Sequence, residues 1–215
     1  GIARLCTSCR VTTRDQFAAD YNVPRGTMAK FDLYADMLID WQSRMNLVGP
    51  STLLDIWVRH FADSAQLYAL GAERSGAWLD LGSGAGFPGL VVSLLGAPNV
   101  HLVESTAKKC RFLEAVRDAL NLQGVTIHNK RVEALPPFAV DVISARALAN
   151  LGQLFEWGLR FATPKTLWLL PKGEAASDEI AAARLKYNFD VDLVPSRSDP
   201  RGKIVIAGRV RRKAV

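Results

Sequence analysis

Residues 78–89 constrain the fold more than any other part of the chain. They read Trp-Leu-Asp-Leu-Gly-Ser-Gly-Ala-Gly-Phe-Pro-Gly, an apolar run with an acid that leads directly into closely spaced glycines. Glycine tolerates positive φ and lets backbone N–H groups come close to a ligand, and Pro88 suits the first turn of a helix. The segment therefore predicts a buried strand, a tight cofactor-binding turn and the start of a helix.

The glycines of this turn fit two classes of cofactor. Gly84, Gly86 and Gly89 have the spacing of dinucleotide-binding enzymes, which is weak evidence when it stands alone. Asp80, two residues before Gly82, instead resembles motif I of the class I S-adenosylmethionine methyltransferases, an acid followed by three alternating glycines. This pattern favours S-adenosylmethionine and makes Asp80 and the first three glycines candidate cofactor contacts. A glycine-rich turn without any ligand is the remaining alternative.

Composition and length indicate one main globular unit. The chain has 215 residues, of which 49% are hydrophobic, enough for one substantial core with an appendage. No segment approaches the roughly 20 apolar residues of a membrane span, and no cleavable signal is visible at the start, so we expect a soluble cytoplasmic protein. Cys6, Cys9 and Cys110 do not complete a four-ligand zinc site, so we expect reduced thiols and no metal.

The chain divides into four predicted parts. Residues 1–26 lack sustained periodicity and predict a leader that is loosely attached or partly disordered. Residues 27–71 predict a cap of two amphipathic helices, one ended by Gly49-Pro50 and one capped by Ser51, with Leu54 among the apolar positions of the second. Residues 72–210 are predicted to form the catalytic, methyltransferase domain, and residues 211–215 a basic tail.

Strands and helices alternate through the catalytic domain. Strands are predicted at 77–81, 99–104, 124–128, 139–144, 165–170, 189–194 and 203–208, with helices at 87–95, 107–121, 149–161 and 174–186. Such alternation predicts an α/β fold with a mostly parallel sheet covered by helices on both faces. The last two strands are too close in sequence for a helical crossover and should pair antiparallel. A sheet of this kind resembles the Rossmann-like sheet of class I methyltransferases.

Candidate ligand contacts follow from the strand ends, because ligands of open α/β sheets bind beyond the carboxyl ends of the strands. Glu104 ends the second strand, where a carboxylate can accept hydrogen bonds from both hydroxyls of a ribose. The segment from Lys130 to Glu133 follows the third strand and could reach an adenine edge. Arg146 follows the fourth strand and should lie at the mouth of the pocket, with an ordinary surface ion pair as the alternative.

The residues after the fourth strand limit the chemistry. This strand leads to Ser144-Ala145-Arg146, without the Asp/Asn-Pro-Pro-aromatic run of amino-group DNA methyltransferases or the Pro-Cys nucleophile of cytosine-C5 enzymes. Guanine N7 is a fitting target, since its lone pair lies in the ring plane and carries no proton. Catalysis would then rest on positioning, which in favourable systems lowers barriers by roughly 7–11 kcal/mol.

Taken in order, these motifs resemble the RsmG (GidB) family of N7-guanosine methyltransferases of bacterial small-subunit (16S) ribosomal RNA. The likeness covers about residues 30–208 and includes Asn46-Leu47, Trp57-Val58-Arg59-His60 with Asp63-Ser64, residues 80–89, Glu104-Ser105 with residues 108–113, Arg131-Val132-Glu133, residues 143–147 and Pro171-Lys172-Gly173. The resemblance implies cofactor contacts from Gly82, Phe87, Val132, Glu133 and Arg146, with Glu104 at the ribose and Arg146 also positioning the reaction. Many relatives carry Asp where Glu104 stands.

Basic residues are concentrated where RNA could bind. The net charge is +6, and residues 197–213 hold seven cations, Arg197 and Arg201 among them, against the single acid Asp199. Cations also open the helix after the second strand, where the helix dipole does not stabilise them. The predicted RNA contacts are Arg59, His60, Lys108, Lys109, Arg111, Lys165, Lys172, Arg197 and Arg201. A structural role for His60 and a solubilising role for the basic tail are the alternatives.

The predicted activity is methylation of guanine N7 in 16S ribosomal RNA by a monomer that binds this RNA or the small ribosomal subunit. Three alternatives remain at this point. A methyltransferase for a small molecule or protein would share the pocket, an NAD-dependent oxidoreductase would use the glycine spacing, and a non-enzymatic RNA-binding module would keep a vestigial pocket.

Overall fold

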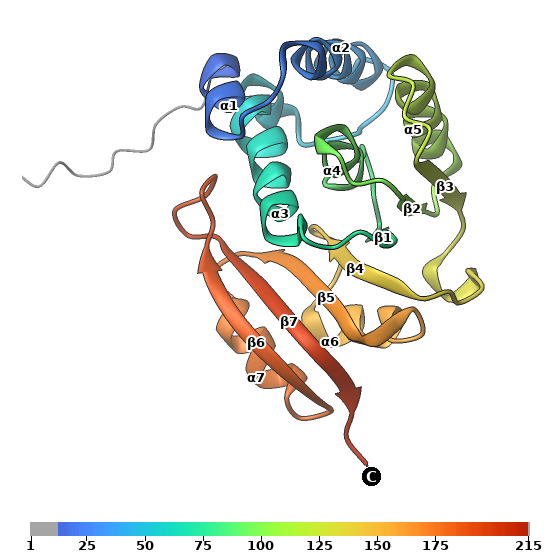
Figure 1. Cartoon of the computed structure of the whole chain (residues 1–215), viewed down its shortest axis with the longest axis vertical. Helices are drawn as coiled ribbons and strands as arrows, with labels where there is room; N and C mark the ends of the chain where they lie inside the picture. Colours follow the sequence, from blue (N-terminus) through green and yellow to red (C-terminus); the bar gives the residue numbers. More distant parts are fainter. Residues whose placement is uncertain (1–12, 215) are drawn as a thin grey trace, which may run out of the picture.

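The computed structural model describes residues 13–214 of the chain and contains a single seven-stranded sheet flanked by helices (Figure 1). The strands are β1 (Trp78–Leu81), β2 (Val100–Glu104), β3 (Val125–Asn129), β4 (Val140–Ala145), β5 (Ala162–Lys172), β6 (Tyr187–Pro195) and β7 (Lys203–Arg212). The helices within and after the sheet are α4 (Gly89–Leu95), α5 (Ala107–Ala119), α6 (Leu151–Gly158) and α7 (Ala176–Ala183), with a 3₁₀ turn η3 (Val132–Ala134). All seven predicted strands and all four predicted helices of this region are confirmed.

The sheet has the order β3-β2-β1-β4-β5-β7-β6. The first five strands of this order are parallel, whereas β7 is antiparallel to both β5 and β6. The predicted antiparallel hairpin is therefore confirmed. Because Leu81 pairs with both Val103 and Ala145, the ends of β1, β2 and β4 lie side by side at one edge. After β1 the chain adds β2 and β3 on one side and then crosses to add β4 and β5 on the other side. Ligands of open α/β sheets bind at this edge, next to such a switch in strand order.

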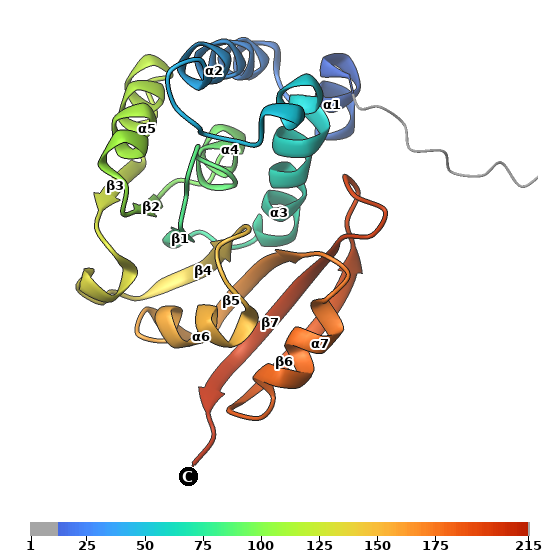
Figure 2. The ribbon, with the colours of Figure 1, turned by 180° about the vertical axis from the view of Figure 1, so that it is seen from behind.

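Helices cover both faces of the sheet (Figure 2). The helices that precede β1, together with α4 and α5, pack against one face, and η3, α6 and α7 pack against the other. Alternation along β1 sends Trp78 and Asp80 to the first face and Leu79 and Leu81 to the second, and all four are buried. A strand buried on both faces is rigid, and it provides a fixed base for the glycine turn that follows it.

The N-terminal segment is better ordered than the sequence predicts. Within the expected leader, helix α1 (Arg14–Asp20) begins at an N-cap, Thr13, whose hydroxyl accepts from the Gln16 N–H. Phe17 of α1 is completely buried and packs edge-on against Phe31, at a centroid distance of 5.0 Å. The prediction of a loose leader is therefore wrong for residues 13–24, because an aromatic side chain anchors them to the core. Residues 1–12, with Cys6 and Cys9, lie outside the described residues.

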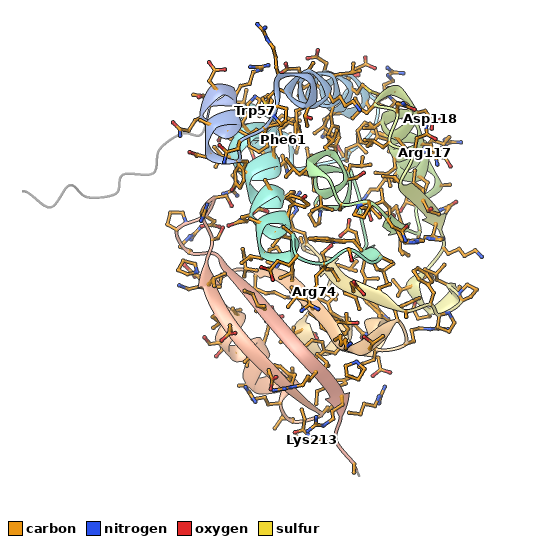
Figure 3. The ribbon with its side chains drawn as sticks, in the orientation of Figure 1. Trp57, Phe61, Arg74, Arg117, Asp118 and Lys213 are labelled. Atoms are coloured by element: carbon orange, nitrogen blue, oxygen red, sulfur yellow. The ribbon has the colours of Figure 1, made fainter. Side chains whose placement is uncertain are left out.

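The helical cap differs in its second half from the continuous helix that was predicted. After α2 (Arg25–Gln42) the chain forms a 3₁₀ turn η1 (Pro50–Asp55), a π-helix η2 (Trp57–Ala62) and helix α3 (Asp63–Gly71). These changes of winding rotate the side chains away from a 3.6-residue period, so Leu54, one of the predicted apolar positions, is 92% exposed while Phe61 is fully buried. Figure 3 shows Trp57 and Phe61 at the junction of this segment with α1.

The basic C-terminal region does not form one surface or a separate tail. Because β6 and β7 are antiparallel, the turn that connects them, residues 196–202, lies at the ligand-binding edge, while the end of β7 lies about 30 Å away. Arg197 and Arg201 belong to the turn, and Arg209, Arg211 and Arg212 belong to the far half of β7. Lys213 marks the far end of the molecule in Figure 3. The predicted positive field is thus divided between two places.

Candidate active site

A cleft of about 1070 Å³ opens at the carboxyl ends of β1, β2 and β4, large enough for a nucleoside cofactor and more. It is bounded by the glycine turn, residues 47–52, η2, residues 130–133, residues 146–149 and the β6–β7 turn. The predicted cofactor contacts that line it are Gly82, Gly84, Phe87, Glu104, Val132, Glu133 and Arg146. Residues from distant parts of the sequence therefore meet in one cleft.

Asp80 and Gly86 do not line this cleft. Asp80 is completely buried beneath the turn, where its carboxylate accepts hydrogen bonds from the Ser144 hydroxyl at 2.9 Å and the Gly89 N–H at 3.2 Å. Burial raises the pKa of Asp80 to about 6, although these donors oppose the rise. A Cβ on Gly86 would lie 2.6 Å from the Tyr34 hydroxyl. Both residues shape the turn from below, and their direct contact with the cofactor stays a prediction.

Glu104 lies at the end of β2 with its carboxylate facing the glycine turn. One carboxylate oxygen accepts from the Gly84 N–H at 3.0 Å and the other from the Thr106 N–H at 2.8 Å, and only 7% of the residue is exposed. These two bonds fix the carboxylate and link the loops that follow β1 and β2. Each oxygen still has a free lone pair, so the group can accept from a pair of neighbouring hydroxyls.

Arg146 is held from several sides at the end of β4. One terminal nitrogen donates to the Arg59 carbonyl at 2.9 Å and to the Asp63 carboxylate at 3.1 Å, and the other donates to Nδ1 of His60 at 2.9 Å. The guanidinium also lies 5.1 Å from the ring centroid of Phe87, a cation–π contact. Its remaining N–H groups have no partner among the described residues, and Arg146 lines the cleft, so they are available to a ligand.

His60 supports Arg146 as a neutral acceptor. Since arginine only donates, Nδ1 must accept, and the proton resides on Nε2, which donates to the Thr52 hydroxyl at 2.7 Å. Burial, followed by the charges of Arg146 and Arg59, lowers the pKa of His60 to about 3. The ring also stacks on Phe87 at a centroid distance of 4.8 Å. His60 therefore lines the cleft but serves Arg146, the structural alternative noted for it in the sequence.

We expect His60 to make the fold less stable in acid. Its pKa lies near 6.5 in the unfolded chain and about 3 in the folded chain, so its full contribution is present above pH 6.5 and is lost as the pH falls toward 3. At pH 5 the loss is on the order of 2 kcal/mol. Denaturant unfolding of the wild type and of His60→Gln, which keeps an acceptor but does not titrate, should show their free energies of unfolding converging between pH 7 and 5.

The comparison of these two proteins isolates His60. Asp80 titrates in the opposite sense, because its raised pKa favours the folded state at low pH, but Asp80 is present in both proteins and cancels. A constant difference between the two free energies across this range would contradict a neutral buried His60.

The predicted RNA contacts lie at different places. Arg59, Lys109 and Lys172 line the cleft, Lys108 and Arg111 are exposed on α5 beside it, and Arg197 and Arg201 are exposed on the β6–β7 turn. Lys172 is already engaged, because its ammonium donates to the Ala149 carbonyl and pairs with Glu179 at 2.8 Å. Lys165 is not at the rim where it was predicted. It lies near the start of β5 beside Arg74, since a parallel strand enters the sheet at the edge opposite the cleft.

Sequence reasoning missed several residues of the site. Thr52, Lys203 and Ser198 line the cleft, and Gln66 joins Ser198 to Asp63 beneath it. No spacing signal marks them, because Gln66 and Ser198 are 132 positions apart. The π-helical winding of η2 also has no simple signature in a sequence. Such π-helical turns often occur at functional sites.

Comparison with known proteins assigns the family. The family model described as rRNA small subunit methyltransferase G (GidB) matches residues 27–202. The chain belongs to this family. It is 45% identical over 190 residues to the ribosomal RNA small subunit methyltransferase G of Paramagnetospirillum magneticum, covering 88% of this chain and 92% of the relative. It is 44% identical over 200 residues to the protein of the same name from Rhodospirillum rubrum, covering 93% and 99%.

Solved structures show the same fold at low identity. The O-methyltransferase of Bacillus cereus in complex with SAH superimposes with a TM-score of 0.59 at 14% identity, covering 90% of this chain and 96% of that chain. A SAM-dependent methyltransferase from Aquifex aeolicus gives 0.58 at 18% identity, covering 75% and 94%. The family match, rather than these structures, confirms a methyltransferase over an enzyme that binds a dinucleotide. This member of the family is an S-adenosylmethionine-dependent methyltransferase.

The residues of the cleft fit S-adenosylmethionine, which supplies an electrophilic methyl group when it is bound. A Cβ on Gly84 would find no atom nearer than the Gly82 carbonyl at 3.9 Å, so the turn leaves open space above it. Glu104 offers a fixed acceptor for a ribose, and Val132 and Glu133 line the cleft after the end of β3.

No group of three or more ligands for a metal ion occurs within residues 13–214. No helix in the same range is long and apolar enough to cross a bilayer.

Proposed function

We propose that this enzyme methylates N7 of a guanosine in 16S ribosomal RNA by positioning the base, without a general base. The proposal is supported by membership in the rRNA small subunit methyltransferase G family and by the state of the side chains around Arg146. N7 carries no proton, so an enzyme that acts on it needs a held base and a near-attack geometry rather than a proton acceptor.

The observation that carries this proposal is that the proton acceptors beside Arg146 are all engaged. His60 uses both ring nitrogens and has a pKa of about 3, so it is a poor base at neutral pH. Asp63 pairs with Arg146 and accepts from Ser198.

Cys110 is a poor nucleophile as well. Its thiol is buried and donates to the Glu104 carbonyl, and burial raises its pKa.

The product identifies the function directly. Purified full-length protein is incubated with S-adenosylmethionine labelled in its methyl group and with small ribosomal subunits that lack the modification, and the RNA is then digested to nucleosides. We expect label in 7-methylguanosine at one site. Label in another nucleoside would reject N7, and label in a protein or small molecule, with none in RNA, would favour the other class of methyltransferase. Naked 16S RNA, tested in parallel, distinguishes free RNA from the assembled subunit as the substrate.

Cations on both sides of the cleft suit a polyanionic substrate. Arg59, Lys109, Lys130, Arg131 and Lys203 line it in addition to Arg146 and Lys172, and Lys108 and Arg111 extend the positive surface along α5. We infer that RNA phosphates contact this rim, including Arg197 and Arg201 of the β6–β7 turn. Within the same proposal, the enzyme acts as a monomer and is located in the cytoplasm. Sedimentation with and without RNA tests the oligomeric state.

Two matched triple variants test which end of β7 contacts RNA. Replacing Arg197, Arg201 and Lys203 by alanine should reduce the magnitude of the slope of log affinity against log salt by about 2–3, because each lost phosphate contact removes roughly 0.7–0.9. The control replaces Arg209, Arg211 and Lys213, which lie at the far end and, like the first set, include one arginine in a surface ion pair. Binding to unmodified subunits is measured at several salt concentrations. Equal slopes for the two triple variants would contradict the proposed rim contacts.

A further inference from the structure

The β6–β7 turn is fastened to α3 by a buried polar cluster. Gln66 of α3, only 4% exposed, accepts from the Arg197 N–H at 2.9 Å and donates toward the hydroxyls of Ser196 and Ser198 at 3.2 and 3.3 Å. In Figures 1 and 2 the turn lies next to α3, although the two segments are far apart in the sequence. A buried polar group without a hydrogen-bond partner is costly. Moving the turn away from α3 would leave several such groups unpaired, so these contacts define one position of the turn.

One member of this cluster reaches the active-site arginine through a single carboxylate. The Ser198 hydroxyl, in a residue that is 8% exposed, donates to one oxygen of Asp63 at 2.6 Å. The other oxygen of Asp63 accepts from Arg146 at 3.1 Å. Gln66 supports the first oxygen with a longer contact of 3.2 Å. Ser198, Asp63 and Arg146 thus form a continuous chain of hydrogen bonds from the turn to the cleft.

Arg146 is held by several groups, of which Asp63 is the one that Ser198 contacts. Phe87 supports the guanidinium of Arg146 from one side, and the Arg59 carbonyl and His60 hold it from η2. Asp63 is its charged partner, and the orientation of this carboxylate depends on the donors to its other oxygen. A hydrogen bond to a charged group is worth about 1.5–3 kcal/mol, more than a neutral one. Loss of the Ser198 hydroxyl would leave this oxygen of Asp63 with only the longer Gln66 contact, and would widen the range of positions of Asp63 and Arg146.

We propose that Ser198 is a positioning residue, which holds Arg146 in its working orientation through Asp63 and so makes turnover depend on the docked position of the β6–β7 turn. This inference rests on the proposed function, because Arg197 and Arg201 on either side of Ser198 belong to the proposed RNA rim. RNA phosphates bound by these two arginines would hold the turn against α3. The same turn would then serve both substrate binding and the orientation of Arg146.

The test compares three single variants of the full-length enzyme on unmodified small subunits. Ser198→Ala removes the donor to Asp63, and we expect kcat to fall about tenfold while KM for the subunit stays within about twofold. Ser198→Thr keeps a hydroxyl and should restore kcat to within about threefold of the wild type. Ser196→Ala is the comparison variant: it removes contacts of the turn to Gln66 and Ser198 but keeps the donor to Asp63, so its kcat should fall by less than about threefold.

A double-mutant cycle with Arg146→Lys tests the route of the effect. If Ser198 acts through Arg146, adding Ser198→Ala to Arg146→Lys should lower kcat by less than about twofold. Equal losses from Ser196→Ala and Ser198→Ala, no rescue by threonine, or additive losses in the cycle would each overturn the inference. Failure of the proposed function looks different, because the wild-type enzyme would then form a methylated product other than 7-methylguanosine, on which the same variants can still be compared.

Discussion

Replacing Gly84 by valine should weaken S-adenosylmethionine binding roughly 10- to 100-fold while the protein still folds. Gly84 has φ +56°, a conformation that a β-branched residue adopts only with strain, and its Cβ would project into open space at the cleft. A side chain in that space would compete with the ligand, and crowding of this kind costs about 1–3 kcal/mol. Titration calorimetry with the cofactor measures the change in affinity, and thermal unfolding of the free protein reports the strain.

Two further variants separate obstruction of the cleft from strain in the backbone. Asparagine tolerates positive φ far better than valine, so Gly84→Asn should fold more stably than Gly84→Val and still lose binding. Gly208→Val lies on β7, has nothing within 4 Å of its Cβ and places a β-branched residue in a strand, so binding should be unchanged. Normal affinity in both Gly84 variants would mean that the ligand does not cross the turn at Gly84.

Much of the sheet could be predicted from the sequence because each strand carries a local signal. An apolar run ending at Asp80, a second ending at Glu104 and the short link between β6 and β7 were enough to derive parallel pairing and the antiparallel hairpin. Local signals could not show how acids at neighbouring strand ends divide their roles. Asp80 is drawn beneath the turn by Ser144 and Gly89, whereas Glu104 faces the cleft, and only the packed structure shows this difference.

The parts that could not be predicted depend on contacts that are distant in sequence or on irregular winding. Phe17 and Tyr21 stand in a leader without sustained periodicity, and only the folded chain brings Phe31 and Phe61 to Phe17. Leu54 has a helical spacing from Phe61, but the 3₁₀ and π turns between them place Leu54 in solvent. In the site, the hydrogen-bonding support of Arg146 comes from segments that precede β1 or follow β6, which strand-end reasoning does not include.

Arg146→Ala should reduce kcat/KM at least 100-fold, a larger effect than its cost in stability. The variant removes the N–H groups that face the cleft and also the charge held between Asp63 and His60. Losing a positioned charged donor at a reacting centre typically costs 10²–10³ in rate. The Asp63 pair is mostly but not fully buried, with 17% and 20% of the side chains exposed, so we expect a stability loss of about 2 kcal/mol. Steady-state kinetics and denaturant unfolding measure the two effects.

A second readout shows whether Arg146 acts where the structure places it. The positive charge of Arg146 helps to lower the pKa of His60, second only to burial, so its removal should raise that pKa from about 3 toward the ordinary value, which NMR titration of the ring detects. Arg146→Lys keeps the charge but not the fork that bonds Asp63 and His60 together, so His60 should stay neutral while activity still falls. Full activity in the lysine variant would show that charge alone suffices, and unfolding of the alanine variant would make Arg146 a structural residue.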